Sequence, residues 1–297
     1  QQTDAGDIPS LPGFGKLKGI ANSPYFANAE PVKPNGDKSA LRLAVMYREP
    51  LSLRISGFDP DVLDLVEIAL PFVLAYHNFG TRKSKGFGCF LPVGTTEKSL
   101  GSLLFSCPDF VAIRKRKVNY SSPDQWLAAI NREYKKLKNQ PDQDEGNLSL
   151  LKDFFEDAGI KWEKEFVSET LGQYKTSPAT GKTSPDNDVR YVRALLGLAE
   201  LYDYPRLEDA RGRTYKSKVN IESHPKKDTI ERFASPLLMK PGPGVLFLVA
   251  RPIEKAMFDQ AFKFTGEKAH ALIQTPSETD FTWADFFSTL SDWQHVK

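Results

Sequence analysis

The sequence contains only two cysteines and four histidines among its 297 residues. Cys89 and Cys107 are too few to form a disulfide framework or a cysteine-based metal site. None of the histidines stands in a metal-ligand spacing such as H-E-x-x-H. These absences predict a protein that needs no metal or other cofactor. They also predict that both cysteines are small buried residues of a protein kept in a reducing compartment.

Long hydrophobic runs are also missing. No stretch of about 18 apolar residues occurs, so the sequence indicates no membrane span. The first residues, Gln1 to Gly6, lack the basic region and the apolar core of a signal peptide. We therefore expect a cytoplasmic location. The chain does not begin with methionine, which is compatible with an N-terminally incomplete first domain.

An excess of positive charge is absent as well, since the formal net charge is only +2. A chain with this balance can bind nucleic acid only where cations gather locally. Three such clusters occur: Arg82, Lys83 and Lys85; Arg114, Lys115, Arg116 and Lys117; and Arg211, Arg213 and Lys216. For the second cluster the alternatives are an edge that faces RNA and a solvated strand end guarded by charge.

The first cluster lies in the most distinctive stretch of the chain, from Gly80 to Phe90. Gly80, Gly86 and Gly88 allow a backbone with positive φ and a close approach by a partner. The cations between them can neutralise phosphates, and arginine can form a forked contact. The nearby aromatic side chains could stack on bases: Phe79, Phe87 and Phe90. This combination is typical of a single-stranded RNA surface.

A plain solvated turn between two elements is the alternative for this stretch. Phe87 has two open roles, since it could stack on a base or anchor the loop against a sheet. Two common phosphate-binding motifs do not fit: Phe87 follows Gly86 where G-x-x-x-x-G-K-[ST] needs lysine, and the G-x-G-x-x-G spacing is missing.

The periodicity of apolar residues predicts an α+β fold rather than a doubly wound sheet. We expect a helix over 60–77, begun by Pro60 and capped by Asp59 or Asp61. Strands are expected over 41–47, 51–56, 89–93, 103–105, 110–113 and 244–250, and further helices over 123–138, 148–166, 189–202, 257–264 and 283–293. The predicted division is a first domain over 1–97 and a second domain over 98–297.

The order of residues from Asn78 to Gly88 resembles the glycine-rich loop of the RAMP superfamily of CRISPR-associated proteins. That loop commonly has Gly-Gly-x-Gly-x-Arg, then basic residues, then Gly-Phe-Gly, whereas Asn78 stands where the family often has glycine. The matching residues are Gly80, Arg82, Lys85, Gly86, Phe87 and Gly88. The segment 232–241 is similar to the Arg-x-x-Ser-Pro start of a strand in this superfamily, and 196–198 to the preceding Leu-Gly-Leu of its Cmr branch.

This resemblance implies two ferredoxin-like, RRM-like domains in tandem. It also implies a non-catalytic RNA-binding subunit of a type III CRISPR ribonucleoprotein, similar to the head-end subunit of the Cmr complex. The implied partners are guide RNA or the guide–target duplex, in antiviral defence, and other subunits of the same superfamily.

Two other functions remain open. One is a CRISPR-repeat-processing endoribonuclease of the same superfamily, in which His77 would be the candidate general acid or base. A histidine that only caps the end of a helix is the plainer interpretation of His77. The other function is an adaptor that binds protein and makes no contact with RNA.

Overall fold

The computed structural model describes residues 14–16, 45–47, 50–80, 83–119, 123–138, 149–171, 181–198, 201–208, 214–225, 230, 233–266 and 268–296. For 14–16, 45–47, 123–128, 131, 201–208 and 214–217 only the backbone is described. The architecture is a mixture of helices and several β-sheets, which confirms the mixed class that the sequence predicts.

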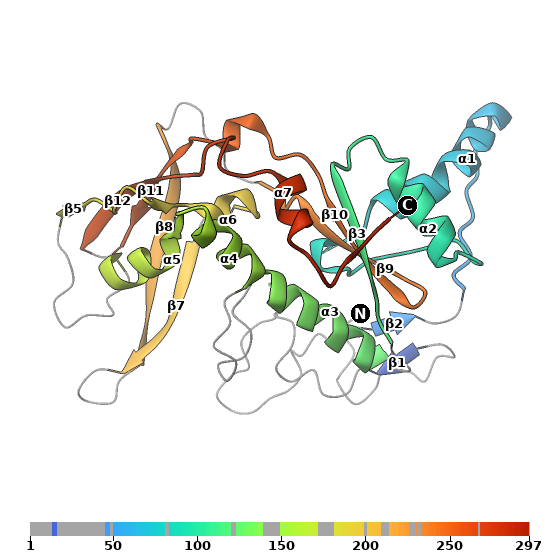
Figure 1. The fold of residues 1–297 in the computed structure, drawn as a ribbon. Coiled ribbons are helices and arrows are strands. Elements are labelled where there is room, and N and C mark those ends of the chain that lie inside the picture. The colour runs from blue at the N-terminus through green and yellow to red at the C-terminus, as the bar shows by residue number, and fades with distance from the viewer. Residues whose placement is uncertain are drawn as a thin grey trace.

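One sheet is assembled from segments far apart in the sequence (Figure 1). Its order is β13 (Gln294–His295), β3 (Ala112–Lys117), β10 (Val245–Ala250) and β9 (Leu237–Gly242), with all neighbours antiparallel. The strand β3 therefore lies between β13 and β10, although more than a hundred residues separate it from either along the chain. This sheet can form only when both halves of the chain fold together.

Both faces of this sheet are covered. Val245, Phe247 and Val249 pack in one cluster with residues of α1 (Pro60–Tyr76) and α2 (Glu97–Phe105). Leu246 and Leu248, which point to the other face, pack in a cluster with residues of α3 (Pro123–Lys138) and α7 (Trp283–Ser288). Because successive side chains alternate between faces, burial on both sides explains why β10 is a continuous apolar run.

A second sheet has the order β5 (Gly181–Thr183), β12 (Ala269–Gln274), β11 (Ala261–Thr265), β8 (Thr214–His224) and β7 (Leu201–Glu208). Only β5 and β12 are parallel neighbours. Tyr191 packs edge-on against Phe262 and Phe264 of β11. These rings belong to the same apolar cluster as Leu246 and Leu248, so one core joins the two larger sheets.

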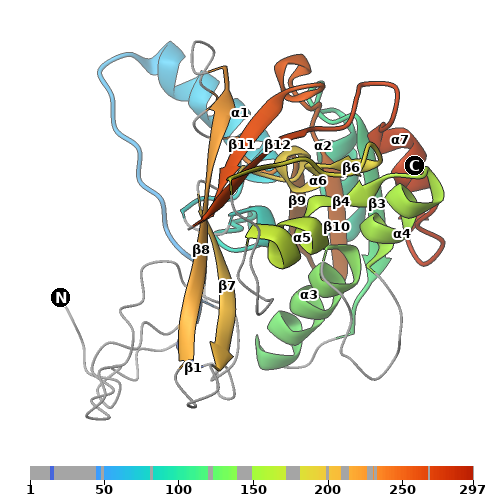
Figure 2. The same ribbon diagram turned by 90° about the vertical axis from the view of Figure 1, so that its left-hand side faces the viewer.

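The remaining elements are short. Two two-stranded pairs occur, β1 (Phe14–Lys16) with β2 (Val45–Tyr47) and β4 (Lys161–Trp162) with β6 (Val189–Arg190). The helices α4 (Leu150–Asp157), α5 (Glu163–Phe166) and α6 (Val192–Leu195) lie above α3 in the view of Figure 2. Single turns of other helix types cover Lys83–Lys85, Val167–Leu171 and Lys255–Met257. No helix in the described part of the chain is long and apolar enough to cross a bilayer.

Two of the long predicted helices, over 60–77 and 123–138, are confirmed, whereas the helix predicted over 148–166 is divided into α4, β4 and α5. α1 begins at Pro60, and the Asp59 side chain accepts hydrogen bonds from the backbone N–H groups of Asp61 and Val62, as an N-cap does. α3 has the predicted bounds. Both helices combine an early proline with a long apolar period, which are the clearest signals a sequence offers.

Several shorter predictions are wrong. The expected strand at 103–105 is the end of α2, whose start is fixed by reciprocal hydrogen bonds between Thr96 and Ser99. The second half of the expected helix at 257–264 belongs to β11, because Phe262 and Phe264 are buried with the period of a strand. The expected helix at 189–202 is mostly β6, the short α6 and the start of β7.

Candidate nucleic-acid interface

The glycine loop, residues 78–90, lies along the outer edge of β9. The Asn78 amide donates hydrogen bonds to the carbonyl oxygens of Lys83, at 2.7 Å, and Met239, at 2.9 Å. The Cys89 thiol donates to the Pro241 carbonyl at 3.4 Å. Proline fits this position because an edge strand needs no donor on its outer side. The loop therefore covers a sheet edge that would otherwise be exposed.

Lys240 binds the first residue of this loop, Asn78. Its side chain is fully buried, and its ammonium donates to the carbonyl oxygens of Leu74 and His77 and to the Asn78 side-chain oxygen. The first two acceptors belong to the C-terminal end of α1, where a positive charge is favourable. Burial lowers the pKa of Lys240, and the nearby Cys89 acts in the opposite direction.

Two glycines close the loop against the protein itself. Gly88 has a φ of 66°, and its carbonyl accepts from the Phe79 N–H at 2.9 Å. A Cβ at Gly88 would lie 1.8 Å from the Phe79 carbonyl oxygen. Gly86 has a φ of 83° and is buried, with the Pro241 ring 3.0 Å from the position of a Cβ. At Gly86 and Gly88 the group that approaches the glycine closely therefore belongs to this chain and not to a binding partner.

Gly88→Ala is expected to destabilise the fold by ~3 kcal/mol or more, because the strained φ and the clash with Phe79 add together. Gly80→Ala is the matched control, since Gly80 also has positive φ, at 77°, but nothing lies within 4 Å of its Cβ position. The control should cost only ~1 kcal/mol. Urea unfolding of both variants measures the difference, and equal losses would contradict the proposed packing.

The outward side of the loop carries the groups that could meet RNA. Lys83 is exposed, and the Lys85 ammonium lies 4.3 Å from the centre of the Tyr134 ring of α3. Phe79 and Phe90 are 42% and 44% exposed, with ring centres 6.2 Å apart. Phe87 is half-buried, so its two proposed roles both stay open. Arg82 lies outside the described residues.

A second lysine faces Tyr134 from the end of α3. The Lys138 ammonium is 5.6 Å from the ring centre and donates to the Leu196 carbonyl at 3.2 Å and the Ser235 hydroxyl at 3.1 Å. Burial, and then the charge of Lys85, lower the pKa of Lys138 to about 7. The glycine loop, the Leu-Gly-Leu segment and the Ser-Pro segment thus meet around one lysine, although they are distant in sequence.

His77 ends α1, directly before the loop. Its backbone N–H donates to Val73, and its ring nitrogen Nδ1 lies 3.3 Å from the Arg251 guanidinium, which also donates to the Tyr76 carbonyl at 3.0 Å. Burial and the charges of Arg251, Lys240 and Lys83 lower the pKa of His77. These cations favour the neutral form of the ring, whereas the charge of Asp109 acts in the opposite direction. Its catalytic role stays a prediction.

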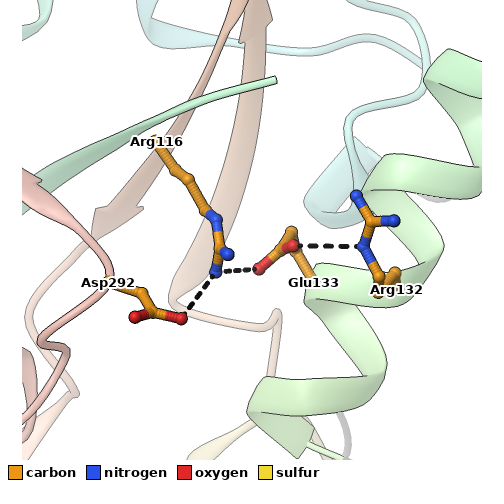
Figure 3. Close-up of polar contacts among 4 residues, drawn as sticks. All are labelled: Arg116, Arg132, Glu133 and Asp292. Atoms are coloured by element: carbon orange, nitrogen blue, oxygen red, sulfur yellow. Dashed lines mark hydrogen bonds and ion pairs between the residues drawn. The ribbon is translucent and has the colours of Figure 1, made fainter. Parts of the chain in front are cut away.

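The basic run on β3 has carboxylate partners. Lys115 is paired with Glu97 at 2.7 Å. Arg116 bridges Glu133 of α3, at 2.9 Å, and Asp292, at 3.3 Å (Figure 3). The almost fully buried Glu133 also lies 3.5 Å from Arg132. Arg116 therefore ties β3 to α3 and to the segment after α7.

The other two cations of this run differ from each other. Arg114 lies opposite His295 of β13, packs over the Phe287 ring and has its pKa lowered by burial. Lys117 is exposed at the end of the strand, beyond the short pairing with β13. Contact between this run and RNA stays a prediction, with Lys117 as the most accessible of its four cations.

The third basic cluster is not placed. Arg211 and Arg213 lie outside the described residues, and only the backbone of Lys216, in β8, is described. Among the residues that the structure describes, no group of three His, Cys, Asp or Glu side chains is arranged to hold a metal ion.

Sequence reasoning missed several residues that build this site: Asn78, Tyr134, Lys138, Lys240 and Arg251. Lys240 carried the clearest signal, because it is a single cation within the apolar run of β9. A charged side chain at such a position is almost never fully buried unless it is paired. Lys138 had no comparable signal, since it follows other lysines on a helix that appears basic on one side.

The fold and this site define a mixed α/β protein with a basic, glycine-rich loop fastened to the edge of a β-sheet. The family model of the Cmr1 N-terminal domain matches residues 16–140, and that of the Cmr1 C-terminal domain matches residues 146–295. The chain therefore belongs to the Cmr1 family, whose members are subunits of type III CRISPR Cmr complexes. Searches of curated proteins and of solved structures find no significant match.

Family membership confirms the resemblance carried by the glycine loop and the two shorter segments. The two family models divide the chain between residues 140 and 146. The sheet that holds the loop crosses this division, because β3 precedes it and β9, β10 and β13 follow it.

Proposed function

We propose that this chain is a non-catalytic RNA-binding subunit of a Cmr complex, acting in cytoplasmic antiviral defence. The glycine loop contacts the guide RNA or the guide–target duplex. Lys83 and Lys85, together with Arg82, neutralise phosphates, and the exposed Phe79 and Phe90 rings stack on bases or pack against sugars.

The observation that carries this proposal is the covering of both faces of the sheet that bears the loop. In an RRM, RNA stacks on an open sheet face. Here helices pack on each side of β10, so such a face is not offered by this sheet. The proposal therefore places RNA contact at the edge, where Asn78 binds β9 and Lys240 at the start of the glycine loop. A pre-ordered loop loses little entropy on binding.

We also propose the tandem ferredoxin-like arrangement, with a first domain over 1–97 and a second over 98–297. Four antiparallel strands with α1 and α2 packed on one face support a relationship to the ferredoxin-like fold, whereas the boundary at residue 97 stays a prediction, since α1 lies before it and the strands of the sheet lie after it.

Replacing Arg82, Lys83 and Lys85 together by alanine tests the function. We expect the affinity for single-stranded RNA to fall by ~10–100-fold and the salt slope of log K to decrease by about 2, because three phosphate contacts are lost. Filter binding across a salt series measures both quantities.

The matched control replaces three exposed lysines away from the loop, Lys98, Lys182 and Lys255, by alanine, which keeps the change in net charge the same. Equal effects in both variants would show that only overall charge matters. Unchanged binding in the loop variant would favour an adaptor without RNA contact. Shortening of the RNA by wild-type protein, lost in His77→Ala, would favour the endoribonuclease.

A further inference from the structure

Helix α1 exposes a wide apolar side to solvent. We call this side the outer face and define it by Val62, Leu65, Ile68, Phe72 and Val73. All five side chains are exposed, with Leu65 at 65% and Ile68 at 66%. Ala75 is the single buried residue among the 17 residues of α1. A helix normally turns so wide an apolar side toward a core or a partner.

Within the described residues, the contacts that anchor α1 involve its C-terminal end. Tyr76 packs edge-on against Phe110, and its hydroxyl is 2.9 Å from the Ser106 hydroxyl. Lys240 binds the last carbonyl groups of the helix. The first turns of α1 project outward at the right of Figure 1, and β5 lies at the far left of the same view. This leaves the outer face accessible along most of its length.

The segment before α1 also exposes apolar side chains. Leu51, Leu53 and Ile55 alternate with polar residues, which predicts a half-buried strand. The structure shows this segment extended and exposed, without a strand partner among the described residues. Phe58 is fully exposed at the start of the helix, and Gly57 lies against Leu63. The unburied apolar surface thus continues from the segment into the outer face.

The charges of α1 and its cap have one sign, although Arg54 lies in the segment before them. No lysine or arginine occurs between Ile55 and Thr81, whereas the helix and its cap carry Asp59, Asp61, Asp64 and Glu67. These carboxylates repel an RNA backbone. A second copy of the same face would bring more carboxylates and no cation. The complementary surface is therefore apolar with lysine and arginine at its border.

We propose that the outer face of α1, with Phe58, docks onto an apolar protein surface bordered by lysine and arginine on another subunit of the Cmr complex. An exposed apolar patch rimmed by polar residues is typical of a protein interface. The inference follows from family membership and the surface of α1, and it does not depend on RNA contact by the glycine loop.

The test combines Leu65→Glu and Ile68→Glu in one chain, coexpressed with the other Cmr subunits and purified through a tag on one of them. We expect the amount retained to fall at least ~10-fold, because two central apolar contacts are replaced by buried charge. Val93→Glu with Leu150→Glu is the matched control, since both residues are exposed and apolar but lie outside α1. It should be retained at the wild-type level.

Two measurements separate docking from folding and from RNA binding. The isolated Leu65→Glu, Ile68→Glu variant should keep the wild-type unfolding midpoint and the wild-type affinity for single-stranded RNA. A photo-crosslinker placed at residue 65 should label a protein subunit at a site with apolar residues and lysine or arginine. Full retention of the variant, or crosslinking to RNA or to a second copy of this chain, would overturn the proposal.

Discussion

Lys240→Met is expected to destabilise the chain by ~3 kcal/mol, because it removes three hydrogen bonds that a buried ammonium donates. In the wild-type protein the three N–H groups of the ammonium each have an acceptor, on Leu74, His77 and Asn78. Methionine fills a similar volume but donates no hydrogen bond. The loss of packing is therefore small, and the loss of hydrogen bonds dominates.

An opposing effect must be weighed for this substitution. Burial without a carboxylate costs the charged lysine part of its hydration, which is why its pKa is lowered. Methionine removes that cost. We expect the orphaned acceptors to outweigh it, since two of them are at the C-terminal end of α1, where a cation is favourable.

Urea unfolding of the full chain measures the change, with Lys98→Met as the control on an exposed lysine of α2. The control should change the free energy of unfolding by less than about 0.5 kcal/mol. Amide hydrogen exchange should also become faster between residues 77 and 90 in Lys240→Met. A variant as stable as the wild type, with unchanged exchange in the loop, would show that Lys240 does not hold it.

The second large effect is a dependence of stability on pH that comes from Lys138. Its pKa falls from 10.5, the ordinary value, to about 7 in the folded protein. The folded state therefore binds fewer protons than the unfolded state between these two pH values. Since stability rises with pH wherever the unfolded state binds more protons, Lys138 makes the fold more stable as pH increases from about 7 to about 10.

The comparison with Lys138→Met isolates this contribution. The free energy of unfolding of the wild type minus that of the variant should increase between pH 6 and pH 9.5, by up to ~3–4 kcal/mol. Burial raises the pKa of Cys89 and Cys107, and both thiols are present in either protein, so their effect cancels. A constant difference across this range would show that Lys138 has an ordinary pKa.

Much of the fold follows from patterns that are strong over many residues. The Asp59 cap, the proline at position 60 and a long apolar period predict α1, and the uniform apolar run of 245–250 predicts β10. Short segments are ambiguous because a few apolar residues fit either a helix or a strand. Gly159, with a φ of 74°, ends α4 within the stretch 148–166 that is predicted as one helix.

The site shows a different limit. Local composition identifies the glycine loop, and the comparison with family models confirms its family. The sequence alone does not show that Gly86 packs against Pro241, because that contact joins segments far apart in the chain. The carboxylate partners of Lys115 and Arg116 likewise come from α2, α3 and the segment after α7.

Lys240 connects the two surfaces proposed for this protein, the glycine loop and the outer face of α1. Lys240 binds the last turn of α1 and the first residue of the glycine loop, Asn78. A partner that docks on α1 would therefore act on a helix whose end helps to set the loop. The variants at Leu65 and Ile68 leave this connection intact, which is why their RNA affinity is expected to stay unchanged.

The most direct test of RNA contact by the glycine loop is photo-crosslinking in the assembled complex. The RNA carries 4-thiouridine, and mass spectrometry identifies the crosslinked peptides of this chain. Our account predicts crosslinks to residues 78–90, above all to the exposed Phe79, Lys83 and Phe90. Crosslinks confined to other segments of this chain, with none in the loop, would contradict it.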